Sequence, residues 1–178
     1  MIGQSAGSGD QPAPRINGAS VSARVVKPTP PRTTAEVRLA RADDIPGILR
    51  LSESYRSEMP DDRPSIDPVR AVEYLRFCVS SELMFLAVVD HDGIKGWLHG
   101  FLGSTYLAAP EAHVDMIYVL PVHRRFSTFR RLWRSFEDWA RGMGASHLSA
   151  SEAHGKSLGP LMRRLEMREL GLYYRKAL

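Results

Sequence analysis

The chain has 178 residues, of which 43% are hydrophobic and 25% are charged, and its formal net charge is +4. These values fit one globular domain with a tail and exclude a wholly disordered chain. The single cysteine, Cys78, excludes an intramolecular disulfide and a zinc site built from cysteines. The longest apolar run, Met84 to Val89, is far shorter than the roughly 20 residues of a membrane helix, and the N-terminus lacks a signal-peptide pattern. We therefore predict a soluble, cytoplasmic protein with no membrane partner.

The N-terminal segment differs in composition from the rest of the chain. Residues 1–35 are rich in Gly, Ser, Ala and Pro and include the proline-rich run 27–32. Such a segment buries too little apolar surface to offset the entropy of ordering it. We predict a disordered arm over residues 1–35 and a folded domain over residues 36–178. A solvated tail and an anchor for a partner subunit both fit this arm.

The first half of the domain predicts one strand and two helices. The alternation in Val37–Ala40 is typical of a short edge strand. Asp43 is a candidate cap for the helix that follows, with Pro46 in its first turn. The pair Asp67-Pro68 is a second helix start, and the apolar spacing after it extends to about Ser80.

The second half predicts strands in succession and then alternating strands and helices. A turn at 90–93 separates the first two strands, and an apolar stripe from Phe129 to Met143 marks the longest helix. The order β-α-α-β-β-β-α-β-α-β predicts an α/β fold, of the α+β kind with a mixed sheet and helices on both faces. The first three strands of this half should form an antiparallel meander, and the strand Ser146–Ser151 should lie parallel to the third of them, Ala112–Leu120. The five strands and the short helix of this half are Leu83–Val89, Ile94–Tyr106, Ala112–Leu120, Ser146–Ser151, Leu158–Leu165 (the helix) and Leu172–Leu178.

The junction between the third strand and the long helix has the features of an anion site. Free N–H groups and the helix dipole meet where a helix begins, and this favours a phosphate. Arginine side chains, which match phosphate oxygens in geometry and charge, are concentrated here. They are Arg124, Arg125, Arg130, Arg131 and Arg134.

This junction resembles the acetyl-CoA-binding signature of the GNAT superfamily, a strand and turn followed by RxxGxG/A. Ile117–Pro121 matches the strand end and turn, and Arg124 matches the signature arginine. The two glycine positions fall on Ser127 and Phe129, as in glycine-poor members encoded by phages. The resemblance covers residues 37–178 and implies the GNAT acyl-CoA N-acyltransferase fold. It also implies an enzyme that uses acetyl-CoA to acetylate a primary amine of a small molecule or protein.

The resemblance also implies a set of cofactor-binding residues. The strand end would pair with the pantetheine arm, and the backbone of the turn and helix start would hold the pyrophosphate. Ser127 should cap the helix, while Phe129 should point into the core and leave its N–H free. The acceptor would enter beside the segment Tyr55–Pro68. The cofactor-binding candidates are Ile117, Tyr118, Val119, Arg124, Arg125, Phe126, Ser127, Thr128 and Phe129.

Catalytic candidates lie on the third strand. By a period of two, Glu111, His113, Asp115, Ile117 and Val119 share one face. Members of the family often use a carboxylate of this strand to deprotonate the amine. The resemblance therefore implies Asp115 as the base, with His113 as the second candidate.

Two alternatives remain open on the sequence. The family's asparagine and tyrosine positions fall on Gly155 and Met162, which favours a catalytically inactive GNAT-fold component of a larger assembly. That assembly could be a phage particle, with the arm as anchor and the protein virion-associated. Nucleic-acid binding through the arginine-rich helix is disfavoured, because exposed aromatic residues do not interleave with the arginines.

Overall fold

A computed structural model describes residues 35–59, 65–103, 109–151 and 159–168 of the chain. The predicted arm, apart from Ala35, and the predicted last strand Leu172–Leu178 lie outside these residues. The described part of the chain contains no helix long and apolar enough to cross a membrane. Two single 3-10 turns, Ala42–Asp44 and Pro121–His123, accompany the main elements. These elements are β1 Glu36–Leu39, α1 Ile45–Ser57, α2 Pro68–Ser80, β2 Met84–Asp90, β3 Ile94–Gly103, β4 Glu111–Val119, α3 Phe126–Gly142, β5 His147–Ala150 and α4 Gly159–Arg163.

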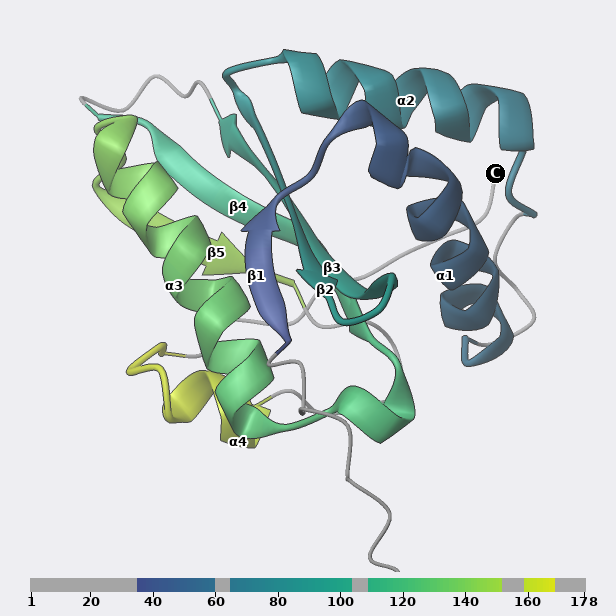
Figure 1. The fold of residues 1–178 in the computed structure, drawn as a ribbon. Helices are drawn as coiled ribbons and strands as arrows, with labels where there is room; N and C mark the ends of the chain where they lie inside the picture. The colour runs from purple at the N-terminus through teal and green to yellow at the C-terminus, as the bar shows by residue number, and fades with distance from the viewer. Residues whose placement is uncertain (1–34, 60–64, 104–108, 152–158, 169–178) are drawn as a thin grey trace, which may run out of the picture. The chain divides into compact units, whose positions relative to one another are not determined.

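The five described strands form one sheet in the order β1-β2-β3-β4-β5 (Figure 1). Neighbours from β1 to β4 pair antiparallel, and β5 pairs parallel with β4. The helix α3 makes the crossover that a parallel pair needs. The predicted meander and the predicted parallel strand are therefore both confirmed.

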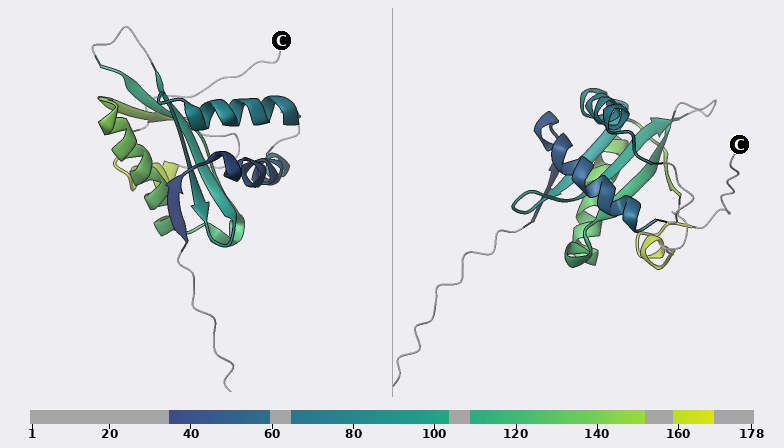
Figure 2. Two further views of the ribbon diagram at one scale, coloured as in Figure 1. Left: turned by 45° about the horizontal axis from the view of Figure 1, so that its top comes forward. Right: turned by 90° about the vertical axis from the view of Figure 1, so that its right-hand side faces the viewer.

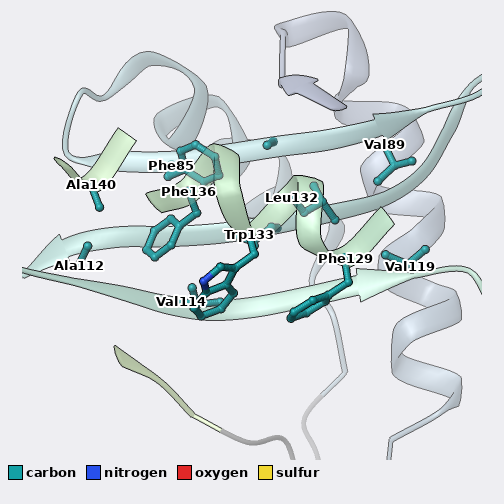
Figure 3. Packing of buried hydrophobic residues seen from close by; sticks show 12 residues of the cluster. Phe85, Val89, Ala112, Val114, Val119, Phe129, Leu132, Trp133, Phe136 and Ala140 are labelled. Atoms are coloured by element: carbon teal, nitrogen blue, oxygen red, sulfur yellow. The ribbon is translucent and has the colours of Figure 1, made fainter. Parts of the chain in front are cut away.

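Helices cover both faces of the sheet. The helix α3 lies on one face, and α1 and α2 lie on the other (Figure 2). On the α3 side, the predicted apolar stripe packs onto β2, β3 and β4 (Figure 3). Its buried members are Phe129, Leu132, Trp133, Phe136 and Ala140.

A second core fills the space under α1 and α2. Ile48 and Leu51 of α1 and Leu75 of α2 pack against the sheet residues Val88 and Trp97. Cys78 of α2 belongs to the same cluster and is buried, and this burial raises the pKa of its thiol to about 11. Buried and protonated, Cys78 has the character of a core residue.

The helix starts agree with the sequence prediction at one place and differ at another. The Asp67 carboxylate accepts the N–H groups of Val69 and Arg70, as a helix cap does. The predicted cap Asp43 is wrong, because the residue before α1 is Asp44. The Asp44 carboxylate accepts hydrogen bonds from the Arg41 N–H and from Arg38, so it ties β1 to the start of α1.

Candidate functional site

A β-bulge in β4 determines where the candidate catalytic residues point. Val114 pairs with Gly100 and Met116 pairs with His99, which leaves Asp115 as an extra residue between two consecutive partners. An extra residue interrupts the alternation of side chains along a strand. The rule that every second residue of β4 lies on the same face of the sheet therefore does not hold across Asp115.

The alternation of side chains between the two faces of the sheet therefore changes phase at the bulge. Ile117 and Val119 pack with the α3 core, whereas Met116 and Tyr118 pack under α1 and α2. Asp115 meets His99 on the α1 and α2 side. The prediction that Asp115 shares a face with Ile117 and Val119 is wrong, and the bulge is the reason.

Asp115 is paired with a buried histidine. Its Oδ2 lies 3.3 Å from Nδ1 of His99, and His99 is 2% exposed. Nδ1 has no partner with hydrogen-bond geometry, so the contact is electrostatic. It lowers the pKa of the Asp115 carboxyl, against the opposing effect of burial and with smaller help from His113. Asp115 is therefore ionised at neutral pH.

The other ring nitrogen of His99 faces α2. Its Nε2 lies 3.1 Å from the Tyr74 hydroxyl and 3.5 Å from the Cys78 sulfur. The rings of Tyr74 and His99 also meet edge to face at 5.4 Å. Tyr74, His99 and Asp115 thus form one line of polar contacts from α2 through β3 to β4.

His113 lies apart from this line. Its Nδ1 is 2.9 Å from the hydroxyl of Ser149 on β5, and its ring packs 5.2 Å from that of Phe101. The contact with Ser149 fastens β4 to β5 where the two strands pair, and the contact with Phe101 joins β4 to β3. The structure does not bring His113 into hydrogen-bond contact with Asp115.

A pocket of about 310 Å³ lies between α1, α2 and the sheet. Its floor is formed by Leu86, Trp97, His99 and Met116, and α1 and α2 contribute mainly aliphatic and aromatic walls. From the predicted acceptor-side segment Tyr55–Pro68, the residues Tyr55, Arg56 and Ile66 line the pocket, while residues 60–64 lie outside the described part. The residues that bring polar groups to its lining are Ser52, Tyr55, Arg56, Tyr74, Trp97 and His99.

The start of α3 offers fewer free N–H groups than the sequence predicts. The helix begins at Phe126, and its N-cap Arg125 provides no side-chain cap. Thr128 and Phe129 both donate their N–H groups to the Arg125 carbonyl, at 3.0 and 3.1 Å. The Phe129 side chain is buried as predicted, but the prediction of a free Phe129 N–H is wrong. The prediction that Ser127 caps the helix is also wrong, because the helix already starts one residue before it.

The first two N–H groups of α3 are available. Those of Phe126 and Ser127 have no backbone acceptor among the described residues. The ring of Phe126 lies 5.3 Å from the guanidinium of Arg164, which follows α4. This helix start therefore presents two N–H donors beside exposed basic side chains.

Arg124 has partners within the protein. Its Nε donates to the Val119 carbonyl at 2.7 Å, and one terminal nitrogen lies 2.7 Å from each carboxylate oxygen of Glu58. The Tyr118 hydroxyl donates to the same carboxylate at 2.8 Å, and the guanidinium lies 5.3 Å from the centre of the Tyr118 ring. Arg124 therefore joins the end of β4 to the end of α1.

The remaining arginines do not form a single cluster. Arg125 is exposed and has no ion pair among the described residues. Arg131 donates to the Ala35 carbonyl at 2.5 Å, and with Arg134 it lines an open groove beside β1. The prediction that the five arginines are concentrated at the start of α3 is therefore wrong for Arg131 and Arg134, which line this groove farther along the helix.

The outer edge of β4 opens after its first residues. Pairing with β5 covers Glu111 to Val114, and the following residues have no partner on that side within the described residues. The Leu120 N–H donates to the Lys95 carbonyl, so the alternation of an antiparallel ladder turns the N–H groups of Ile117 and Val119 toward the open edge. This edge leads directly to the start of α3.

The described residues contain no group of three or more His, Cys, Asp and Glu side chains arranged to hold a metal ion.

Comparison with known proteins agrees with this architecture. The model of the Acetyltransferase (GNAT) family matches residues 48–159. No curated protein gives a significant match.

Solved structures match most of the chain at low identity. A ribosomal-protein-alanine N-acetyltransferase from Brucella melitensis biovar Abortus 2308 has a TM-score of 0.67 at 18% identity and covers 82% of this chain and 100% of its own. A glucosamine-6-phosphate N-acetyltransferase from Arabidopsis thaliana has a TM-score of 0.67 at 12% identity, with 82% and 99% covered. An aminoglycoside antibiotic 6'-N-acetyltransferase from Acinetobacter baumannii has a TM-score of 0.63 at 17% identity, with 82% and 99% covered. These likenesses show the fold, and the match over more than half of the sequence shows that the chain belongs to the GNAT acetyltransferase family.

Proposed function

We propose that this protein is an acetyl-CoA-dependent N-acyltransferase that moves an acetyl group onto a primary amine of a small molecule or protein. The observation that carries the proposal is made on the described residues: the edge of β4 beyond Val114 is unpaired there, and it leads to two N–H groups at the start of α3 that have no backbone acceptor. An extended amide chain that ends in phosphates would find hydrogen-bond donors along this whole path. Membership of the GNAT family supports acyl transfer in general.

The residues present fit the cofactor in part. Ile117 and Val119 would pair with the pantetheine arm through their backbone. The N–H groups of Phe126 and Ser127, with the exposed Arg125, would hold the phosphates. Acetyl-CoA supplies an acetyl group activated as a thioester.

The other cofactor candidates have supporting positions. Thr128 and Phe129 direct their N–H groups to the Arg125 carbonyl, so they would fix the helix start rather than contact phosphate. Tyr118 and Arg124 would hold the turn in place through Glu58. The phosphate site would therefore offer fewer N–H donors than the sequence predicts.

Asp115 is the stronger of the two catalytic candidates. Its side chain is 43% exposed and lies where β4 separates from β5. His113 is bonded to Ser149 on the paired part of the strand. Asp115 would take part in the step that removes a proton from the acceptor amine.

The alternative of a catalytically inactive GNAT-fold component, such as a virion-associated phage protein, stays a prediction. Two observations favour it: the bonded Phe129 N–H and the pairing of Arg124 with Glu58. Both remove donors that a phosphate would use. Its proposed anchor, the arm of residues 1–35, lies almost wholly outside the described residues.

Calorimetric titration with acetyl-CoA tests the proposal. The wild-type chain should bind, and the Arg125→Glu variant should bind roughly tenfold or more weakly, because a charged hydrogen bond contributes about 1.5–3 kcal/mol. The matched control is Arg141→Glu, a charge reversal at the far end of the same helix, where Arg141 pairs with Asp138. It should change the affinity by less than about twofold. No binding to the wild-type chain would contradict the acyltransferase and favour the assembly component.

A further inference from the structure

The pocket between α1, α2 and the sheet has one apolar body and one polar edge. Most of its lining is aliphatic or aromatic, and no carboxylate lines it among the described residues. Its size lies at the lower end of small-molecule sites. Among the described lining residues, a ligand with several ammonium groups would find no carboxylate, whereas one apolar group would be well covered.

The polar edge is built around His99. Two of its neighbours, Tyr74 and Asp115, are each 43% exposed, while His99 itself is buried. The imidazole therefore connects a hydroxyl in the pocket with a carboxylate at the bulge of β4. This arrangement offers a proton route along one face of the sheet, from α2 through β3 to β4.

The charge of Asp115 fixes the direction of this route. A carboxylate beside Nδ1 favours the tautomer that carries its proton on Nδ1, which leaves Nε2 to accept the Tyr74 hydroxyl. Burial raises the pKa values of both Tyr74 and Cys78, so both stay protonated at neutral pH. The titratable or charged groups around the pair are Cys78 on α2, Asp115 and His113 on β4, and Arg56 on α1.

We infer that this pocket takes a small primary amine with an apolar body and a single ammonium group, and that Tyr74 and His99 remove the proton of that group. The inference rests on the proposed acyltransferase function and specifies its acceptor. The ammonium passes one proton to the Tyr74 oxygen while the Tyr74 hydroxyl proton moves to Nε2 of His99. The products are a neutral amine, an intact tyrosine and an imidazolium paired with Asp115. The proton returns to water by the same route after the product leaves.

In this scheme Tyr74 and His99 are catalytic residues, and Asp115 is a positioning residue that acts through His99. The acceptor class and the proton route are tested separately. The first is measured by kcat/KM for different amines, and the second by kcat and its pH profile in variants.

Acceptor class is tested with phenethylamine and ethanolamine as probes, with acetyl-CoA as donor and the full chain as enzyme. Burying a phenyl group should raise kcat/KM for phenethylamine roughly tenfold to a hundredfold over ethanolamine. Kanamycin, with several ammonium groups, should not exceed ethanolamine. Equal or better use of ethanolamine or kanamycin would overturn the acceptor class while leaving the acyltransferase intact.

The proton route is tested with Tyr74→Phe, which removes one hydroxyl from a half-exposed residue. We expect kcat for phenethylamine to fall roughly a hundredfold or more, with KM and acetyl-CoA affinity within about threefold of wild type. The variant's rate should rise about tenfold per pH unit toward the pKa of a free amine, near 10, whereas the wild-type rate should level off at lower pH. Ser80→Ala, which removes a hydroxyl from the same helix, should behave as wild type.

Asp115→Asn gives a second variant, because substitution of the buried His99 itself could unfold the protein. It should lower kcat roughly tenfold or more and move the pH profile in the same direction as Tyr74→Phe. Wild-type kcat and pH profile in Tyr74→Phe would overturn the proton route. Failure of the wild-type chain to bind acetyl-CoA in the calorimetric titration would instead overturn the proposed function, and this inference with it.

Discussion

Replacing Phe136 with alanine should lower the free energy of unfolding by about 3–5 kcal/mol, as is usual for a large aromatic residue removed from a core. The Phe136 side chain is fully buried. Its ring lies 5.4 Å from that of Phe85 and 5.5 Å from that of Trp139. A Cβ added to Gly100 would lie 2.6 Å from this ring, so the ring packs directly on the backbone of β3. The cavity would lie between a helix and a sheet, which cannot easily move together to fill it. Urea denaturation followed by circular dichroism measures the effect.

Phe77→Ala is the matched control, because it makes the same change at a residue of α2 that is 54% exposed. It should alter the free energy of unfolding by no more than about 0.5 kcal/mol. A cost below about 1 kcal/mol for Phe136→Ala would mean that α3 does not pack on the sheet as described.

Elements with strong local signals could be predicted from the sequence. The stripe that includes Phe136 has the 3- and 4-residue spacing of a helix face, and it lies where the structure places α3. The turn between β2 and β3 was marked by its residue types, and Asp92 and Gly93 indeed have positive φ angles of 54° and 98°. Topology followed from the order of the elements and the handedness of parallel crossovers.

The geometry around Asp115 could not be predicted in the same way. A bulge depends on the register between two strands, and no residue type beside Asp115 in β4 itself marks one. Because of this one extra residue, Ile117 and Val119 lie on the opposite face of the sheet from Asp115. The sequence therefore predicted the strand that carries Asp115 but the wrong neighbours for this residue.

Contacts between distant elements were missed for a related reason. Arg124 and Glu58 are 66 positions apart, and their pairing depends on how α1 packs against β4. The contact between Tyr74 and His99 likewise depends on how α2 lies across β3. The alternation that places His99 beside Trp97 was readable in the sequence, but it does not distinguish a functional histidine from a buried structural one. The exact start of a helix is also hard to predict from sequence. Because α3 begins at Phe126, the Phe129 N–H donates to the Arg125 carbonyl and is not free.

Replacing Arg38 with methionine should lower the free energy of unfolding by about 2–4 kcal/mol at pH 7, because it leaves a largely buried carboxylate without its partner. Arg38 lies 2.6 Å from Oδ2 of Asp44 and 2.7 Å from Oδ2 of Asp90. Its guanidinium thereby joins β1, the start of α1 and the end of β2. Methionine keeps most of the aliphatic stem, so the change isolates the charge and its hydrogen bonds. Urea denaturation at a series of pH values measures it.

The pH dependence of this effect has a definite sign. The hydrogen bond from Arg38 lowers the pKa of the Asp44 carboxyl in the folded protein, against the opposing effect of burial. A lowered carboxyl pKa stabilises the fold above the pKa of the unfolded chain, near 4, and the stabilisation is lost as the pH falls through the folded value. The difference between wild type and Arg38→Met should therefore be full at pH 7 and should shrink below about pH 4. Arg70→Met is the matched control, since Arg70 and Asp67 form an exposed pair, and it should change the free energy of unfolding by no more than about 1 kcal/mol at any pH. If the two variants were equally stable at pH 7, or if the Arg38→Met difference grew in acid, Arg38 would not be the group that keeps Asp44 ionised.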